Sequence, residues 1–417
     1  MKISQNERSI LRNLAENVAE IALLPVHKQT ADLWRRLNGL EKVRPLVWIN
    51  EIPWHEMDVD GELDLQCEND FSRWAEQEMR RTIYLWHHAP VDMVVENVFY
   101  SRLVIHDTGF GIKEDVDAIK QDEKSNIISR GFHQQIQDES DVEKIKMPVI
   151  NHVKKASEEN YQILVDVFGD ILKIEKRGLI HQWFAPWDEL IRWWDVQDAL
   201  TDMITRQELV HQVMERLISA YLCRLDQYVE MNLLSFARGN FRVGSGGLGY
   251  TDELPKQGFD PNVVRTMDQW GCAAAQIFSD VSPAMHEEFA LQYERRWLER
   301  FGLNYYGCCE PLHNKMNILK SIPNLRKISM SPWANLEKAV ANIGDNYVIS
   351  YKPNPAVLAT DNWNVESARK NLTTDLDKLQ GCVVEIILKD ISTVQYQPQR
   401  LWEWTKMAME VVSERKQ

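Results

Sequence analysis

Four short apolar segments late in the sequence carry polar residues at alternate positions, and this pattern constrains the fold more than any other feature. The segments are 303-LNYYGCCEPLH-313, 326-RKISMSP-332, 347-YVISYKP-353 and 383-VVEIILKD-390. Side chains alternate between the two faces of a strand, so each segment has an apolar and a polar face. The polar sets are Lys327, Ser329 and Ser331, then Ser350 and Lys352, then Glu385 and Lys389. Consecutive strands with polar groups toward their carboxyl ends are typical of the (β/α)8 barrel, an α/β fold whose pocket lies at that end.

Strand segments alternate with helical segments over most of the chain. We predict strands that begin near residues 93, 171, 241, 272, 303, 326, 347 and 383, with helical spacing between them. Eight parallel strands are the number that closes a small barrel. The first 88 residues have mainly helical periodicity. We therefore predict an N-terminal helical extension over residues 1–88 and a (β/α)8 TIM barrel over residues 89–417.

The charge and the cysteine content indicate the class of partner. The formal net charge is −14, which argues against nucleic acid, because phosphates call for a basic surface. No apolar run approaches the roughly 18 residues that a membrane helix needs, and the first residues read as an amphipathic helix rather than a signal peptide. The six cysteines are scattered, which favours a reducing compartment. We expect a cytoplasmic enzyme that acts on a small molecule.

The segment that begins at residue 303 carries side chains that suit a metal ion. Strand alternation places Tyr306, Cys308 and Glu310 on one face, and His313 follows within a turn. Thiolate, carboxylate and imidazole groups are ligands of Zn²⁺. Cys308, Glu310 and His313 are thus candidate zinc ligands, with Tyr306 facing the substrate. Alternatively, the adjacent cysteines are small buried hydrophobic residues beside a surface histidine.

Two lysines and a glutamate are candidates for acid–base or binding roles. Lys352 and Lys389 end the inward faces of neighbouring strands, and Glu96 stands near the carboxyl end of the strand expected near residue 93. A desolvated lysine binds carboxylates or acts as an acid or base. We assign catalysis to Glu96, Lys389 and Glu310, and substrate binding to Lys352. The alternative for Lys389 is a buried ion pair, for example with Glu385 or Glu96.

Three further features have both a functional and a structural interpretation. Trp187 lies in the tryptophan-rich stretch 183-WFAPWDELIRWW-194, which either walls a pocket or packs in the core. His286 lies in the first turn of a helix that Ser282 and Pro283 open, either at the pocket mouth or favoured by the helix end. The glycines in 240-NFRVGSGGLGYTDEL-254 either cradle a phosphate or form a plain turn. We predict substrate contacts for Trp187 and His286.

The order of these parts resembles the uroporphyrinogen decarboxylase superfamily of TIM barrels. This superfamily also includes corrinoid and coenzyme M methyltransferases and cobalamin-independent methionine synthases. The matching parts are 184-FAPW-187, 282-SPAMHEEFALQYERRWLERFGL-303, 305-YYGCCE-310, the strand with Ser329 and Ser331, the strand ending in Lys352, and 383-VVEIILKDISTVQYQPQRLWEW-404. The resemblance covers roughly residues 90–412.

The chain departs from the motifs of both branches. The decarboxylases carry an arginine-rich signature after the first strand, where 95-VENVFYSRLVIHD-107 has only Arg102. The methyltransferases carry a His-x-Cys zinc motif at the fifth strand, where this chain has Tyr306-Gly307-Cys308. They place a second cysteine beyond the eighth strand, where this chain has 389-KDIST-393.

The resemblance implies three alternative functions. The first is a corrinoid-dependent methyltransferase that demethylates a small O- or N-methylated substrate and uses Zn²⁺, with cobalamin on a partner protein as the methyl acceptor. The second is a metal-free decarboxylase or lyase in which Lys352 and Lys389 bind a small carboxylate. The third is a sensor or scaffold that has kept the barrel without its chemistry. A homodimer is compatible with each of them.

Overall fold

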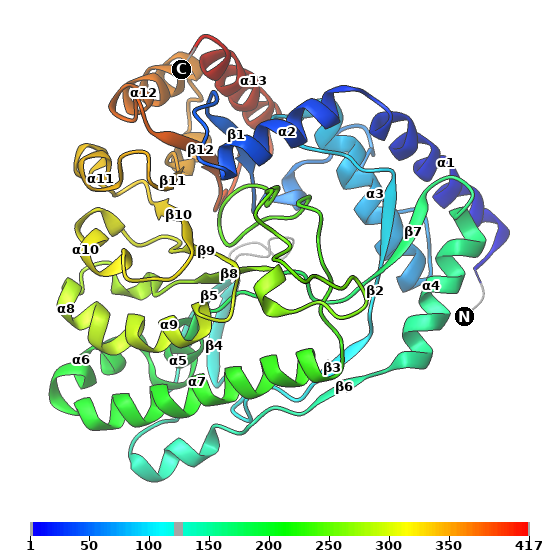
Figure 1. Ribbon diagram of the computed structural model, residues 1–417. Coiled ribbons are helices and arrows are strands. Elements are labelled where there is room, and N and C mark those ends of the chain that lie inside the picture. The colour runs from blue at the N-terminus through cyan, green and yellow to red at the C-terminus, as the bar shows by residue number, and fades with distance from the viewer. Residues whose placement is uncertain (1–2, 121–127, 416–417) are drawn as a thin grey trace.

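The computed structural model describes residues 3–120 and 128–415, and its largest element is a six-stranded sheet (Figure 1). The order across the sheet is β1-β12-β11-β10-β9-β8, and every neighbouring pair is parallel. The strands are β1 (Leu46–Ile49), β8 (Trp270–Ala273), β9 (Leu303–Tyr306), β10 (Leu325–Met330), β11 (Val348–Tyr351) and β12 (Val383–Leu388). All six carboxyl ends therefore lie at one edge, as the predicted α/β fold requires.

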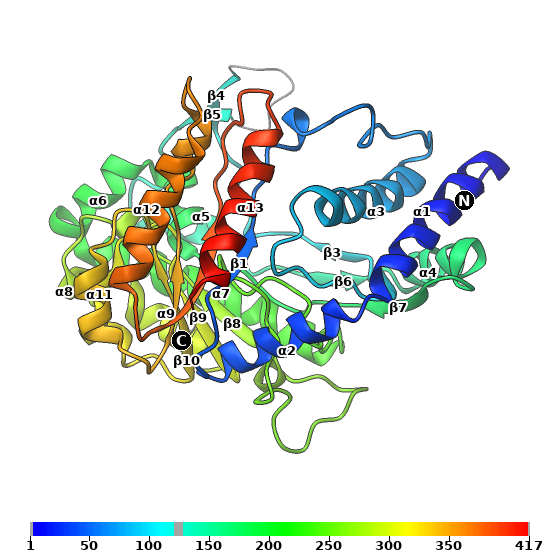
Figure 2. The same ribbon diagram turned by 90° about the horizontal axis from the view of Figure 1, so that it is seen from above.

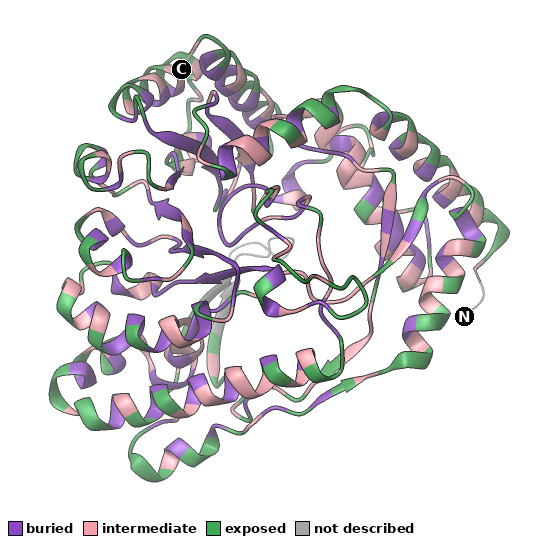
Figure 3. Ribbon diagram, viewed as in Figure 1, coloured by how far each residue is buried: buried purple, intermediate pink, exposed green. Residues whose placement is uncertain are grey.

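The two faces of this sheet differ as the alternating pattern predicts. Ile328 and Ile386, with their apolar neighbours, belong to the main hydrophobic cluster, which they share with the surrounding helices. Lys327, Ser329 and Glu385 lie on the other face and are also fully buried. Figure 3 shows that the strands are buried while the helices turn green, exposed faces outward. The inner face of the sheet is thus both polar and closed to water, which is costly unless its groups pair with one another.

Helices cover the outer face of the sheet and one end of the molecule. Those after β8 are α8 (Pro283–His286), α9 (Gln292–Leu298), α10 (Met316–Leu319), α11 (Leu336–Ile343), α12 (Val365–Lys378) and α13 (Gln399–Ser413). Outside α9 lies a further group, α5 (Pro186–Trp194), α6 (Val196–Thr205) and α7 (Gln207–Glu230). None of the described helices is long and apolar enough to cross a membrane.

A smaller parallel sheet lies beside the large one. It pairs β2 (Val98–Arg102) with β7 (Lys173–Arg177). The helices α1 (Gln5–Ala22), α3 (Asp70–His88) and α4 (Lys154–Phe168) pack around it with their own hydrophobic cluster, and Figure 2 shows them at the end opposite α8 and α11. Two antiparallel pairs complete the strands, β3 (Ile105–Asp107) with β6 (Ile150–His152) and β4 (Val116–Lys120) with β5 (Ile128–Phe132).

The strand prediction is confirmed for the second half of the sheet and corrected elsewhere. The strands expected near residues 272, 303, 326, 347 and 383 are β8 to β12. Those expected near 93 and 171 pair with each other as β2 and β7, and near 241 there is only a bridge between Arg242 and Leu248. Within the described residues the hydrogen-bonded order therefore runs from β1 to β8 without closing into a ring. Coil segments adjoin both edges, through Asp92 N on Val47 O (3.1 Å) and Ala274 N on Phe184 O (3.1 Å).

The N-terminal residues are not wholly helical, which corrects the prediction for residues 1–88. After α1 and α2 (Val26–Asn38), the apolar run 46-LVWI-49 forms β1, which pairs with β12. A four-residue strand followed by a proline-containing loop carries too little periodicity to be recognised beside three long helices. The sheet therefore includes a strand from each end of the chain, and the expected boundary at residue 88 separates β1 from its partner.

The glycine-rich segment covers a carboxylate instead of forming a strand. Gly247 N donates to Glu385 Oε1 at 3.2 Å, and Lys327 Nζ donates to Glu385 Oε2 at 2.8 Å and to Leu248 O at 3.3 Å. A Cβ on Gly246 would lie 2.4 Å from Glu385 Oε1, and one on Gly247 would lie 2.3 Å from the Trp34 ring. Only glycine fits here, and the anion that the loop contacts is the chain's own Glu385.

Candidate functional site

A lysine, two thiols and two carboxylates meet where β9, β12 and β1 end. Lys389 Nζ lies 3.5 Å from Cys308 Sγ, 3.8 Å from Cys309 Sγ, 2.6 Å from Asp390 Oδ2 and 3.3 Å from Glu51 Oε2. The two sulfur atoms are 3.4 Å apart. The Lys389 side chain is only 4% exposed. We call this group the lysine–thiol cluster. The Lys389 ammonium is therefore surrounded by two thiols and two carboxyl groups, each of which is negatively charged when it loses its proton.

The groups of the lysine–thiol cluster shift one another's pKa values. The hydrogen bond with Cys309 and the charge of Lys389 lower the pKa of Cys308, although burial opposes them. Burial disfavours the ammonium, but Cys308, Cys309 and Glu51 outweigh it and raise the pKa of Lys389. The hydrogen bond to Cys308 and burial raise the pKa of Cys309. The arrangement therefore favours a Cys308 thiolate beside a lysine that stays protonated.

The backbone of the lysine–thiol cluster is strained. Glu51 follows β1 with φ 52°, Asp390 follows β12 with φ 56°, and Gly307 follows β9 with φ 97°. The left-handed region costs a residue with a side chain about 1–2 kcal/mol. Such residues persist where the surrounding structure holds them, and they gather at functional sites.

Tyr305, and not the predicted Tyr306, faces the inside of the sheet. The Tyr305 hydroxyl lies 3.1 Å from Ser350 Oγ and 2.9 Å from Ser245 Oγ. The alternation ends at Tyr306 because β9 ends there and Gly307 takes a positive φ. Counting by twos from Tyr306 to Cys308 and Glu310 therefore placed Tyr306 on the wrong face.

Lys352 is engaged by the protein and not free for substrate. Its Nζ donates to Tyr305 OH at 3.0 Å, to Ser329 Oγ at 2.7 Å and to Ser350 O at 3.4 Å. An ammonium has three N–H donors, so all are used. Ser329 Oγ in turn donates to Cys308 O at 2.6 Å. Lys352 therefore supports the turn that carries Cys308, which corrects its assignment to substrate binding.

Tyr306 and His286 belong to a buried chain of hydrogen bonds on the outer side of β9. Tyr306 OH lies 2.5 Å from Glu294 Oε2 and 2.6 Å from His286 Nε2, and Lys315 Nζ lies 3.0 Å from His286 Nδ1. Burial raises the pKa of Glu294 to about 8, and burial with Lys315 lowers the pKa of His286 to about 3. This hydrogen-bonded network lies between β9 and α9. The structure therefore does not support the substrate contacts predicted for Tyr306 and His286.

Glu310 accepts a hydrogen bond from the backbone of the lysine–thiol cluster. Its Oε2 accepts from Cys308 N at 2.8 Å, while the buried Oε1 has no hydrogen-bond partner among the described residues. Glu310 also contributes to raising the pKa of Asp188 to about 6, although burial is the main cause. The structure therefore shows Glu310 as a support for the Cys308 turn, and its contacts do not include Lys389.

The predicted zinc ligands and Trp187 are placed differently from expectation. Within residues 3–120 and 128–415, no group of three or more His, Cys, Asp or Glu side chains could hold a metal ion. Cys308, Glu310 and His313 therefore do not fit a zinc site, because Glu310 turns back onto the Cys308 backbone. Trp187 is fully buried and donates to Phe289 O at 2.9 Å, so it packs in the core.

Glu96 lines a separate cavity of about 460 Å³. Its Oε2 accepts from Tyr100 OH at 2.9 Å. Arg242 lines this cavity and also lies 3.1 Å from Glu51 Oε1 of the lysine–thiol cluster. Glu96 thus faces a space large enough for a small ligand, and among the described residues it makes no hydrogen bond or ion pair with Cys308 or Lys389.

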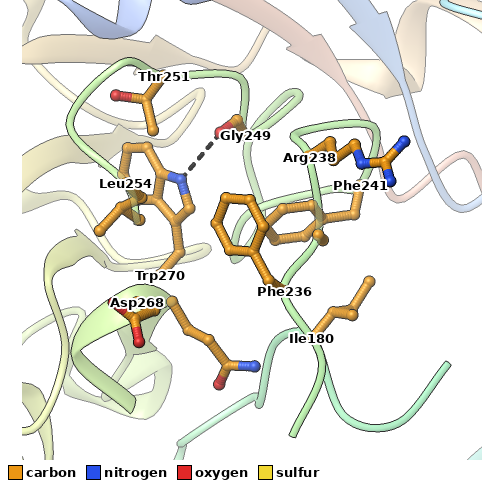
Figure 4. A pocket seen from close by; sticks show the side chains of 11 residues that line it. Ile180, Phe236, Arg238, Phe241, Gly249, Thr251, Leu254, Asp268 and Trp270 are labelled. Atoms are coloured by element: carbon orange, nitrogen blue, oxygen red, sulfur yellow. Dashed lines mark hydrogen bonds between the residues drawn. The ribbon is translucent and has the colours of Figure 1, made fainter. Parts of the chain in front are cut away.

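A second hollow, beside the amino end of β8, is too small for a substrate (Figure 4). Trp270 fills most of it and donates from Nε1 to Gly249 O at 3.0 Å, with Phe236 and Phe241 opposite. The remaining space is about 10 Å³, room for at most one water.

Sequence reasoning missed three members of the site, Glu51, Asp390 and Arg242. Glu51 comes from a segment interpreted as a loop and reaches the site because β1 pairs with β12. Arg242 comes from the strand expected near residue 241, which does not form, and it contacts the site through its ion pair with Glu51. Asp390 follows Lys389 directly, so strand alternation predicts that its side chain points to the opposite face, away from the site. A signal existed for Asp390, because aspartate is among the few residues that tolerate a positive φ.

No family model matches the chain, and no curated protein matches it by sequence. Among solved structures, the chain is similar to a methyltransferase from Methanosarcina mazei with a TM-score of 0.52 and 13% identity. The match covers 91% of this chain and 97% of that protein. At this identity the similarity concerns the fold, which the two chains share over nearly their whole length.

Proposed function

We propose that the protein is a methyltransferase that removes a methyl group from a small O- or N-methylated substrate. The observation that carries this proposal is the lysine–thiol cluster, in which a buried ammonium stands at the carboxyl ends of parallel strands. The shared fold with a methyltransferase supports the class. The acceptor that we expect is cobalamin on a partner protein, whose reduced form is a strong nucleophile for methyl groups.

The difficult step of demethylation is the departure of the heteroatom from the methyl carbon. When the bond from carbon to oxygen or nitrogen breaks, its electron pair stays on the heteroatom, and the charge that develops there must be stabilised. We assign this role to the Lys389 ammonium, which then gives its proton to the heteroatom and regains one from solvent. Cys308, Asp390 and Glu51 are positioning residues that keep Lys389 charged and in place.

The contacts of the two lysines bear on the decarboxylase alternative. That function needs Lys352 and Lys389 to bind a substrate carboxylate. All three donors of Lys352 are used within the protein, which leaves this lysine none for a substrate carboxylate. No observation therefore favours it over methyl transfer.

The experiment measures demethylated product by mass spectrometry, with a panel of small O- and N-methylated compounds and reduced cobalamin as the acceptor. We expect turnover of at least one compound, and Lys389→Met lowers it by about 100-fold, the usual effect of removing one charge-stabilising donor. Lys320→Met is the matched control, because Lys320 is an exposed lysine. A Lys389→Met protein with the wild-type rate, or a wild-type protein inactive on the whole panel, contradicts the proposal.

A further inference from the structure

The cavity lined by Glu96 has the size and walls of a ligand site. Its volume is about 460 Å³, within the range of small-molecule pockets. It lies among β1, α3, β2 and β7, which supply most of its lining. The aromatic residues that line it are Trp48, Trp74, Phe99, Tyr100 and Phe241. A flat apolar body would have several rings to pack against.

The charge of this cavity is opposite to that of the whole chain. Four arginines line it, Arg81, Arg102, Arg177 and Arg242, against two glutamates, Glu78 and Glu96. The formal balance is 4 − 2 = +2, in a protein of net charge −14. A positive pocket with apolar walls in an acidic protein concentrates small anions.

Two arginines of this cavity, Arg177 and Arg81, have neither a hydrogen bond nor an ion pair among the described residues, and Arg81 lies over the Trp54 ring at 4.7 Å. Arg102 pairs with Glu78, and Arg242 pairs with Glu51. The Arg177 guanidinium lies 3.2 Å above the Tyr100 ring. In the described part of the chain, no hydrogen bond or ion pair engages its side-chain nitrogens. Burial lowers the pKa of Arg177, as expected for a charge held out of water.

We propose that this cavity binds a small organic carboxylate, with the carboxylate on the Arg177 guanidinium and the apolar body against Trp48. The planar guanidinium offers two parallel N–H donors that match a carboxylate. Glu96 stands near Arg177 and disfavours a doubly charged phosphate. The identification of this ligand as the methylated substrate rests on the proposed function, and it makes that substrate an O- or N-methylated organic acid.

Binding is tested without turnover, by titrating the complete protein with benzoate and following heat release by calorimetry. Benzamide, the uncharged analogue of the same shape, and inorganic phosphate are titrated in parallel. We expect benzoate to bind at least about tenfold more tightly than benzamide, and Arg177→Met to remove this preference, since charge-assisted pairs exceed neutral ones by about 1.4 kcal/mol or more. Phosphate is expected not to displace benzoate.

Two controls keep the outcome interpretable. Arg102→Met removes the same charge from a lining residue that is already paired, and we expect it to keep the benzoate preference. Trp48→Leu keeps the charge and weakens benzoate and benzamide alike. Equal loss in Arg177→Met and Arg102→Met, equal binding of benzoate and benzamide, or displacement by phosphate overturns the proposal. Benzoate binding without any demethylation on the panel would contradict the proposed function alone.

Discussion

At the scale of single residues, the unusual feature is a buried ammonium beside two thiols at the carboxyl ends of the strands. Lys389 stands at the end of β12, and its Nζ contacts both Cys308 and Cys309. A lysine cannot ligate a metal while it is protonated, and the surrounding thiols and carboxylates hold it in that state. The residue that we expect to stabilise the leaving group is therefore a side chain of the protein.

The reactivity of Cys308 with iodoacetamide tests this charge arrangement. The pKa of Cys308 is lowered by Cys309 and Lys389, so at any given pH a larger share of Cys308 is thiolate than of an ordinary thiol. We expect Cys308 to be alkylated at lower pH than free glutathione, as followed by peptide mass spectrometry. In Lys389→Met the positive charge is gone, so the pKa rises and the pH profile shifts upward. An unchanged profile in Lys389→Met would count against the ion pair, and Lys320→Met is the control.

At the scale of secondary-structure elements, a buried ion pair ties together two strands that are not neighbours. Lys327 on β10 and Glu385 on β12 are 2.8 Å apart and fully buried, with β11 between them. Strands two apart are separated by roughly 10 Å, so the pair meets because the sheet curves around it and the lysine is long. The glycine segment covers the pair from the inside.

Removing one member of this pair should be costly. Lys327→Met leaves Glu385 as an unpaired buried charge, and we expect a loss of about 3–5 kcal/mol in the free energy of unfolding. Lys327→Met with Glu385→Leu removes both charges, so we expect it to regain a large part of that loss. Urea unfolding followed by circular dichroism measures both. A single variant as stable as the wild type would show that the pair contributes little to stability.

At the scale of the whole molecule, the two ends of the chain build one sheet. β1 pairs with β12, and Glu56 Oε2 accepts from Thr393 Oγ1 at 2.9 Å and from Val394 N at 2.7 Å in the segment after β12. The first 88 residues also supply Trp34, which covers the glycine segment. These residues therefore act as part of the large sheet rather than as an appendage.

Truncation tests this integration. We expect a protein of residues 89–417 to lack cooperative unfolding, because β12 loses β1, one of its two neighbours, and the segment after β12 loses the Glu56 contacts. Thermal unfolding followed by circular dichroism is the measurement. Supplying residues 1–88 as a separate chain should restore a cooperative transition. Residues 89–417 that unfold cooperatively alone, with the wild-type midpoint, would support an independent N-terminal extension after all.

The sequence alone determined the strands from β8 to β12 and their two-faced character, because strand alternation is a local property. It placed Tyr306 on the wrong face, because a positive φ at Gly307 ended the alternation, and it did not foresee that Glu310 turns back onto the Cys308 backbone. Only the tertiary structure decided that β1 completes the sheet, that Glu51 and Arg242 join the site, and that Arg177 faces a cavity without a partner. These depend on contacts between residues far apart in the chain, which no local pattern encodes.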